Sequence, residues 1–107
     1  MDFQLFFNEV KQDIISLVKE KFGQEGAKVK SEIEVFLDNS KEKLQRWASL
    51  MEQGAITPAE LEILLQSQKD ILIFESLYKA GISKIKIGMF KNAAIKLIVT
   101  KAVTFIL

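Results

Sequence analysis

The chain contains neither histidine nor cysteine among its 107 residues, and this restricts the chemistry that its side chains can perform. Zinc sites of the usual His and Cys kinds, thiolate nucleophiles, disulfides and Ser-His-Asp relays all need one of these two residue types. A Mg²⁺ or Ca²⁺ site made of carboxylates alone stays open, but the acidic residues form no EF-hand loop and no cluster at loop spacing. We therefore expect no bound metal and no cofactor.

Glu75 is the carboxylate with the best claim to be a general base, because Phe74 and Leu77 place apolar side chains beside it. Lys79 follows four residues later, however, which is the favourable order for an ion pair along a helix. Lysine, tyrosine and carboxylate chemistry stays open, but no constellation of these residues points to a reaction. The sequence therefore predicts a protein that is not an enzyme.

Charge is divided unevenly along the chain. All 14 acidic residues lie between Asp2 and Glu75, where nine basic residues leave a net charge of −5. The 32 residues after Glu75 carry six lysines and no acid, a net charge of +6. Two interpretations follow: the basic tail packs against the acidic helices of its own fold or of a neighbouring copy, or it binds an anionic partner.

The lysines of this tail do not gather on one side of a helix. At about 100° per residue, the lysines at 84, 86, 91, 96 and 101 spread around the whole circumference, with apolar residues between them. This argues against a basic amphipathic membrane helix, and the single arginine, Arg46, argues against nucleic-acid binding. A helix with apolar residues on nearly every side is typical of one buried within a protein assembly.

Apolar spacing and local motifs predict the helices. A stripe through Phe3, Phe7, Val10, Ile14 and Leu17 predicts a helix over residues 2–22, capped by Asp2 and ended by Gly23. A near-heptad pattern predicts one long helix over residues 27–53, in which Ser40 is a weak point. Thr57, Pro58 and Glu60 form a capping box that opens a helix over residues 58–80, and these two long helices should form an antiparallel hairpin.

Residues 84–107 fit two structures. Polar and apolar residues alternate from Lys84 to Met89, as in a strand, and a β-hairpin turning at residues 91–94 is one interpretation. A stripe at helical spacing favours a helix instead, and we prefer it because the preceding segments are helical; its members are Phe90, Ala94, Leu97, Ile98, Ala102 and Phe105.

The whole pattern predicts a single all-α domain over residues 1–107, a three- or four-helix bundle. We expect a non-catalytic structural or adaptor subunit that self-associates or docks into a larger protein assembly through its apolar C-terminal segment. The alternative is a peripheral protein of membrane or lipid surfaces, since 16 of the 26 residues from Ile82 to Leu107 are apolar. The N-terminus lacks secretory-signal features, so a cytoplasmic location is expected. The expected partner-interface residues are Phe3, Phe7, Ile85, Ile87, Met89, Phe90, Leu97, Ile98 and Phe105.

Overall fold

The computed structural model describes residues 1–28, 30–67, 78–79 and 81–106, and these residues contain helices but no strand. The helices in chain order are α1 (Phe3–Phe22), α2 (Gln24–Lys28), α3 (Lys30–Asn39), α4 (Lys41–Glu52), α5 (Pro58–Gln66) and α7 (Lys84–Ile106). The prediction of an all-α chain is confirmed for this part of the sequence. The C-terminal segment is a helix, so the alternative of a β-hairpin is wrong.

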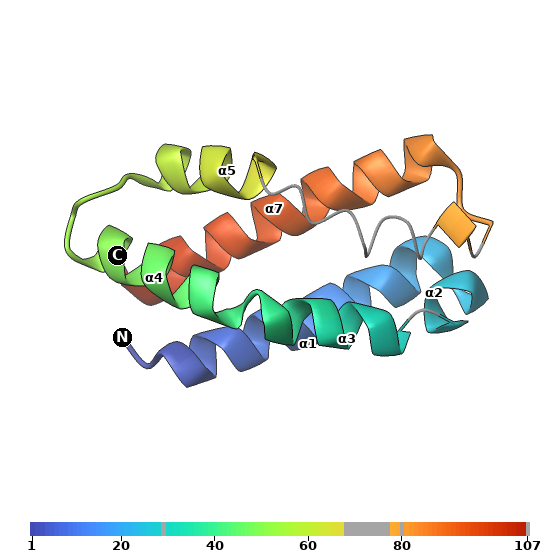
Figure 1. The fold of residues 1–107 in the computed structure, drawn as a ribbon, viewed down its shortest axis with the longest axis horizontal. Coiled ribbons are helices and arrows are strands. Elements are labelled where there is room, and N and C mark those ends of the chain that lie inside the picture. The colour runs from blue at the N-terminus through green and yellow to red at the C-terminus, as the bar shows by residue number, and fades with distance from the viewer. Residues whose placement is uncertain (29, 68–77, 80, 107) are drawn as a thin grey trace.

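The helices lie lengthwise in an elongated molecule of 41 × 23 × 20 Å. α1 and α7 are packed side by side and run in opposite directions, which brings both ends of the chain to the same end of the molecule (Figure 1). α3 and α4 return along α1, and α5 packs against α7. α7 also contacts α4, so it packs against three helices: α1, α4 and α5.

α1 begins and ends where the sequence predicts. The side chain of Asp2 accepts a hydrogen bond of 3.2 Å from the amide of Leu5, satisfying an N–H group that has no partner within the helix. Gly23 ends the helix at a φ of 57°, a conformation that glycine adopts without a steric penalty. The buried residues of α1 keep the spacing of one helical face and are Phe6, Phe7, Val10, Ile14, Val18 and Phe22.

α2 starts directly after Gly23 and lies close against α1. Gly26 is buried there, and a Cβ atom at this position would lie 2.6 Å from Cγ1 of Val18 and 2.9 Å from its carbonyl oxygen. Such distances are far below van der Waals contact. Glycine at position 26 therefore allows the two helix backbones to approach each other.

The long helix predicted over residues 27–53 is divided. α3 ends at Asn39, α4 begins at Lys41, and Ser40 lies between them. The hydroxyl of Ser40 donates a hydrogen bond of 3.0 Å to the carbonyl of Phe36, four residues earlier. Serine side chains that bond to the backbone in this way often bend a helix, and this bond accompanies the break at Ser40.

α5 opens with both hydrogen bonds of the predicted capping box. The amide of Glu60 donates to the hydroxyl of Thr57, and the amide of Thr57 donates to the carboxylate of Glu60. In each bond the donor and the acceptor lie 3.1 Å apart. The predicted helix over 58–80 is seen as α5, while residues 68–77 and 80 lie outside the described residues. The antiparallel hairpin of 27–53 with 58–80 is therefore not established as predicted.

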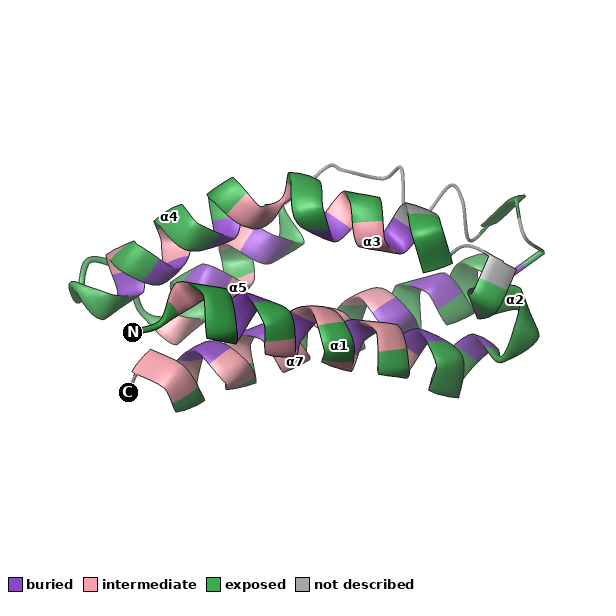
Figure 2. Ribbon diagram, turned by 90° about the horizontal axis from the view of Figure 1, so that it is seen from below, coloured by how far each residue is buried: buried purple, intermediate pink, exposed green. Residues whose placement is uncertain are grey.

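The described helices share an apolar core whose members come from α1, α3, α4, α5 and α7, together with Ile82, which precedes α7. Buried residues recur along the facing sides of these helices (Figure 2, purple). Aromatic contacts join α1 to α7 near both ends: the rings of Phe6 and Phe105 lie 5.7 Å apart, and those of Phe22 and Phe90 lie 5.4 Å apart. These contacts fix α7 along α1.

Candidate functional site

The predicted interface residues fall into three groups. Phe7, Ile87, Phe90 and Ile98 are buried in the core of the chain, and Phe3, Leu97 and Phe105 are half-buried. Ile85 and Met89 are exposed, with 78% and 59% of their surface in contact with solvent. The buried side chains pack within their own chain, so Ile85 and Met89 are the members of the set best placed to meet a partner.

Ile85 and Met89 lie four residues apart and therefore share one side of α7. The same side continues through Asn92, Lys96, Thr100 and Val103, and we call these six residues the outer α7 face. All are exposed except Val103, which is half-buried. Lys96 carries the one charge on this face, so the outer α7 face is weakly charged and apolar at its N-terminal end.

Exposed lysines surround the apolar end of this face. Lys84 and Lys86 flank Ile85 in the first turn of α7, and Lys79 is exposed just before it. The ammonium of Lys84 lies 5.8 Å from the centre of the Tyr78 ring, which is 57% exposed. This end of α7 thus combines aliphatic, aromatic and cationic side chains on one surface.

Lys101 differs from these lysines because it points towards α1. Its ammonium lies 3.1 Å from Asp13 and 3.3 Å from Glu9, two carboxylates one turn apart on α1. Hydrogen bonds to Asp13 and then to Glu9 raise the pKa of Lys101 above its ordinary value. Part of the basic tail therefore pairs with acidic residues of its own fold.

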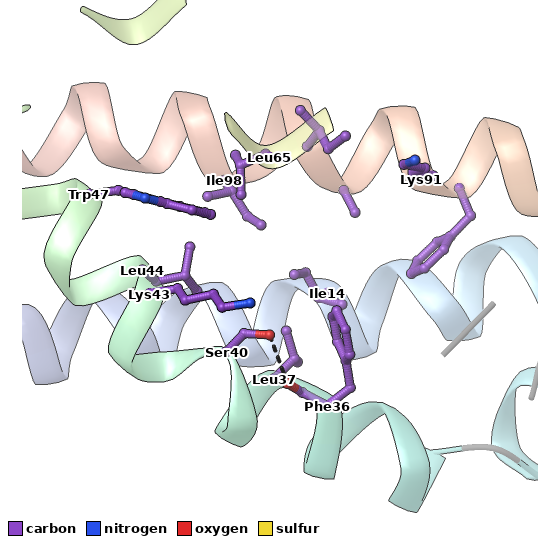
Figure 3. A pocket seen from close by; sticks show the side chains of 13 residues that line it. Ile14, Phe36, Leu37, Ser40, Lys43, Leu44, Trp47, Leu65, Lys91 and Ile98 are labelled. Atoms are coloured by element: carbon purple, nitrogen blue, oxygen red, sulfur yellow. Dashed lines mark hydrogen bonds between the residues drawn. The ribbon is translucent and has the colours of Figure 1, made fainter. Parts of the chain in front are cut away.

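An apolar cavity of about 90 Å³ lies where five helices meet (Figure 3). Each of α1, α3, α4, α5 and α7 contributes apolar side chains to its wall, including Ile14, Phe36, Leu44, Leu65 and Ala94. Trp47 and Lys91 lie towards opposite ends of the cavity, and the dashed bond in Figure 3 joins Ser40 to Phe36. Among the described residues of the lining, Lys43 is the second cationic one.

The cavity was not predicted from the sequence. Its walls come from segments as distant as Ile14 and Ile98, and no local spacing indicates that such side chains leave a space between them. The pairing of Lys101 with Asp13 was foreseen only as a general attraction between the basic tail and the acidic helices.

Comparisons with protein-family models, curated proteins and solved structures found no match. Assignment of a role therefore rests on the geometry of this chain. Within the described residues, no three His, Cys, Asp or Glu side chains come together in a group suited to a metal ion. Glu75, the residue considered as a general base, lies outside the described part of the chain. None of the described helices combines the length and apolar character needed to cross a membrane.

Proposed function

We propose that this chain is a non-catalytic structural or adaptor subunit that joins a protein assembly through the outer α7 face. The observation that carries the proposal is the exposure of Ile85 and Met89 at neighbouring positions of one helix. Burying such a side chain completely stabilises a complex by roughly 1.5–3 kcal/mol. Neighbouring exposed apolar residues with few charges between them are typical of contact surfaces. A cytoplasmic location is part of the same proposal.

The partner surface that suits this face has an apolar centre and an acidic rim, because the surrounding charged residues of α7 are all lysines. A second copy of the chain offers acidic helices, since the residues up to Glu75 carry a net charge of −5. We therefore propose that α7 of one copy docks on the acidic helices of another. Such a contact joins different surfaces of the two copies and builds a ring or a filament.

Light scattering after size exclusion tests self-association with the 107-residue chain. We expect a mass above that of one chain, which falls with dilution and with added salt because the contact is assisted by charge. Replacing Ile85 and Met89 by glutamine should shift the mass to a single chain. The control replaces Thr104, which is exposed on α7 but is not part of the outer α7 face, by glutamine and should leave the mass unchanged. A single-chain mass at every protein concentration would overturn self-association.

The lysines around Ile85 favour a second candidate, a peripheral protein on an anionic membrane. Tyr78 and Ile85 are exposed beside Lys79, Lys84 and Lys86, and residues of these types gather at membrane surfaces. Flotation with phosphatidylserine vesicles, compared with phosphatidylcholine vesicles, separates the two candidates. A discrete oligomer that does not float supports the assembly subunit. A single chain that floats with the anionic vesicles alone supports the membrane protein and rejects the first proposal.

A further inference from the structure

We propose that the outer α7 face of one copy docks on α5 of a second copy, where Ile85 and Met89 pack against Ile63. The receiving surface, called here the outer α5 face, consists of Ala59, Glu60, Ile63 and Gln66. This inference rests on the proposed self-association, and it assigns the helix that receives α7.

α5 packs against α7 of its own chain and leaves its opposite side in solvent. Leu61 and Leu65 are buried, whereas Ile63 is 62% exposed. At about 100° per residue, Ile63 lies about 200° around the helix from each of these leucines. The other three members of the outer α5 face lie three or four residues from Ile63, and all of them are exposed. Ile63 is therefore an apolar side chain that its own chain leaves largely uncovered.

The charges on α5 and α7 are complementary. α5 contains two acidic residues, Glu60 and Glu62, and no basic residue. α7 has the opposite composition, with five lysines and no acidic residue. The exposed lysines Lys84 and Lys86 flank Ile85, so an apolar centre with a cationic rim on α7 meets an apolar centre with an acidic rim on α5. Such complementarity steers two surfaces together and fixes their register.

Two other helices carry exposed apolar side chains near acidic residues, but those acids already have partners. Glu9, one turn after Leu5 on α1, lies 3.3 Å from the ammonium of Lys101. Asp38, three residues after Val35 on α3, lies 2.9 Å from the ammonium of a lysine on α1. Among the described residues, neither glutamate of α5 has an ion pair. The acidic charge available to a second copy beside an exposed aliphatic side chain is therefore that of α5.

The small size of the outer α5 face limits the strength of the contact. α5 has nine residues, and its length is about 13 Å at a rise of 1.5 Å per residue. Stable interfaces bury about 800 Å² on each partner, and one side of so short a helix supplies only part of this area. The contact therefore belongs to the weak and reversible class, and the associated fraction should fall on dilution and with added salt.

Two variants of the 107-residue chain, each lacking one of the two surfaces, test the pairing by light scattering after size exclusion. Ile63→Gln alters the outer α5 face and leaves α7 intact. Ile85→Gln with Met89→Gln alters the outer α7 face and leaves α5 intact. Each variant alone should have the mass of one chain at a concentration where the unmodified protein associates. Their equimolar mixture should form a pair of two chains, because one intact α7 can dock on one intact α5 and no further chain can add.

Further variants separate α5 from the other acidic helices. Val35→Gln is the matched control for Ile63→Gln, because Val35 is 58% exposed on α3, and it should leave the mass of the assembly unchanged. Glu62→Lys should weaken association several-fold, because it places a cation opposite the lysines of α7. Adding Lys86→Glu to Glu62→Lys should restore at least part of the association. Circular dichroism verifies that each variant keeps the helix content of the unmodified protein.

The possible results distinguish this inference from the proposed function. A single-chain mass for the unmodified protein at every concentration rejects both. If the unmodified protein associates and Ile63→Gln associates equally well, the assembly subunit stands and the assignment of α5 is overturned. Loss of association in Val35→Gln alone, or no pairing in the mixture, overturns it as well. Should Ile63→Gln fail to fold, Glu62→Lys with and without Lys86→Glu decides the question, since an unchanged mass in Glu62→Lys rejects α5 as the receiving helix.

Discussion

The ammonium of Lys101 lies 3.1 Å from a carboxylate oxygen of Asp13, and this ion pair joins the last turns of α7 to α1. Glu9, one turn before Asp13, places a second carboxylate oxygen 3.3 Å from the same ammonium. Lys101 is half-buried, so its stem also covers apolar surface between the two helices. The separation of charge along the sequence is therefore partly compensated within a single chain.

Replacing Lys101 by glutamine should lower the stability of the protein in a pH-dependent way. Folding raises the pKa of Lys101, so the ion pairs stabilise the native state fully below the unfolded-state pKa of about 10.4. That contribution is lost as the pH rises through the higher pKa of the folded state. The free energy of unfolding, measured in urea for both proteins, should differ by a constant amount from pH 7 to about pH 9.5 and converge above pH 10.5.

Lys96→Gln is the matched control for this prediction, because Lys96 lies on the same helix but is exposed. Its difference from the unmodified protein should be small at every pH. A difference for Lys101→Gln that persists unchanged at alkaline pH would show that the ion pairs are not its source.

Phe6→Ala should weaken the packing of α1 against the C-terminal end of α7 and so lower the stability of the protein. The Phe6 side chain is 1% exposed and contacts the ring of Phe105, so its removal should cost about 3–5 kcal/mol of stability. The neighbouring Leu5 is 51% exposed, and Leu5→Ala should cost less than about 1 kcal/mol. Urea unfolding of the two variants measures the contrast. Similar losses for both would contradict the packing of α1 on α7.

Thr57→Ala should remove the cap of α5. The amide of Glu60 loses its hydrogen-bond acceptor, and the expected loss of stability is about 1 kcal/mol. Thr100→Ala is the control, because Thr100 is exposed and lies away from both ends of α7. It should be neutral or slightly stabilising because alanine favours helices. The midpoints of thermal unfolding distinguish the two. A neutral Thr57→Ala would mean that the end of α5 frays without cost.

Local signals were sufficient to predict where α1 and α5 begin and where α1 ends. Asp2, Gly23 and Thr57 each act on backbone groups within a few residues, so their effects are encoded close to where they occur. Ser40 shows where this kind of inference stops. The apolar spacing continues through it as if the helix were continuous, but α3 ends at Asn39 and α4 begins at Lys41.

The candidate surface was harder to predict, because α7 has apolar residues on nearly every side. In a strand, Ile85, Ile87 and Met89 would share one side, whereas in a helix Ile87 lies away from the other two. The structure buries Ile87 and exposes Ile85 and Met89. Only the packing of α7 on the rest of the chain distinguishes these sides, and the cavity depends on the same long-range packing.

The two glycines at positions 26 and 88 should respond in opposite directions to substitution by alanine. A methyl group at position 26 would lie 2.6 Å from a methyl group of Val18, and an atom at that distance forces α2 away from α1. We expect Gly26→Ala to cost roughly 1–3 kcal/mol. At position 88, on α7, a methyl group meets no atom within 4 Å, so the higher helix propensity of alanine should stabilise the protein by about 0.5–1 kcal/mol.

A third variant separates the sources of strain at Gly26. Combining Gly26→Ala with Val18→Ala removes the side-chain clash but leaves the carbonyl oxygen of Val18, 2.9 Å from the new methyl group. The double variant should therefore remain less stable than Val18→Ala alone, because a backbone oxygen cannot move without displacing α1. Urea unfolding of the four proteins measures this coupling. If the double variant equals Val18→Ala in stability, the α2 backbone does not approach α1 as closely as the structure places it.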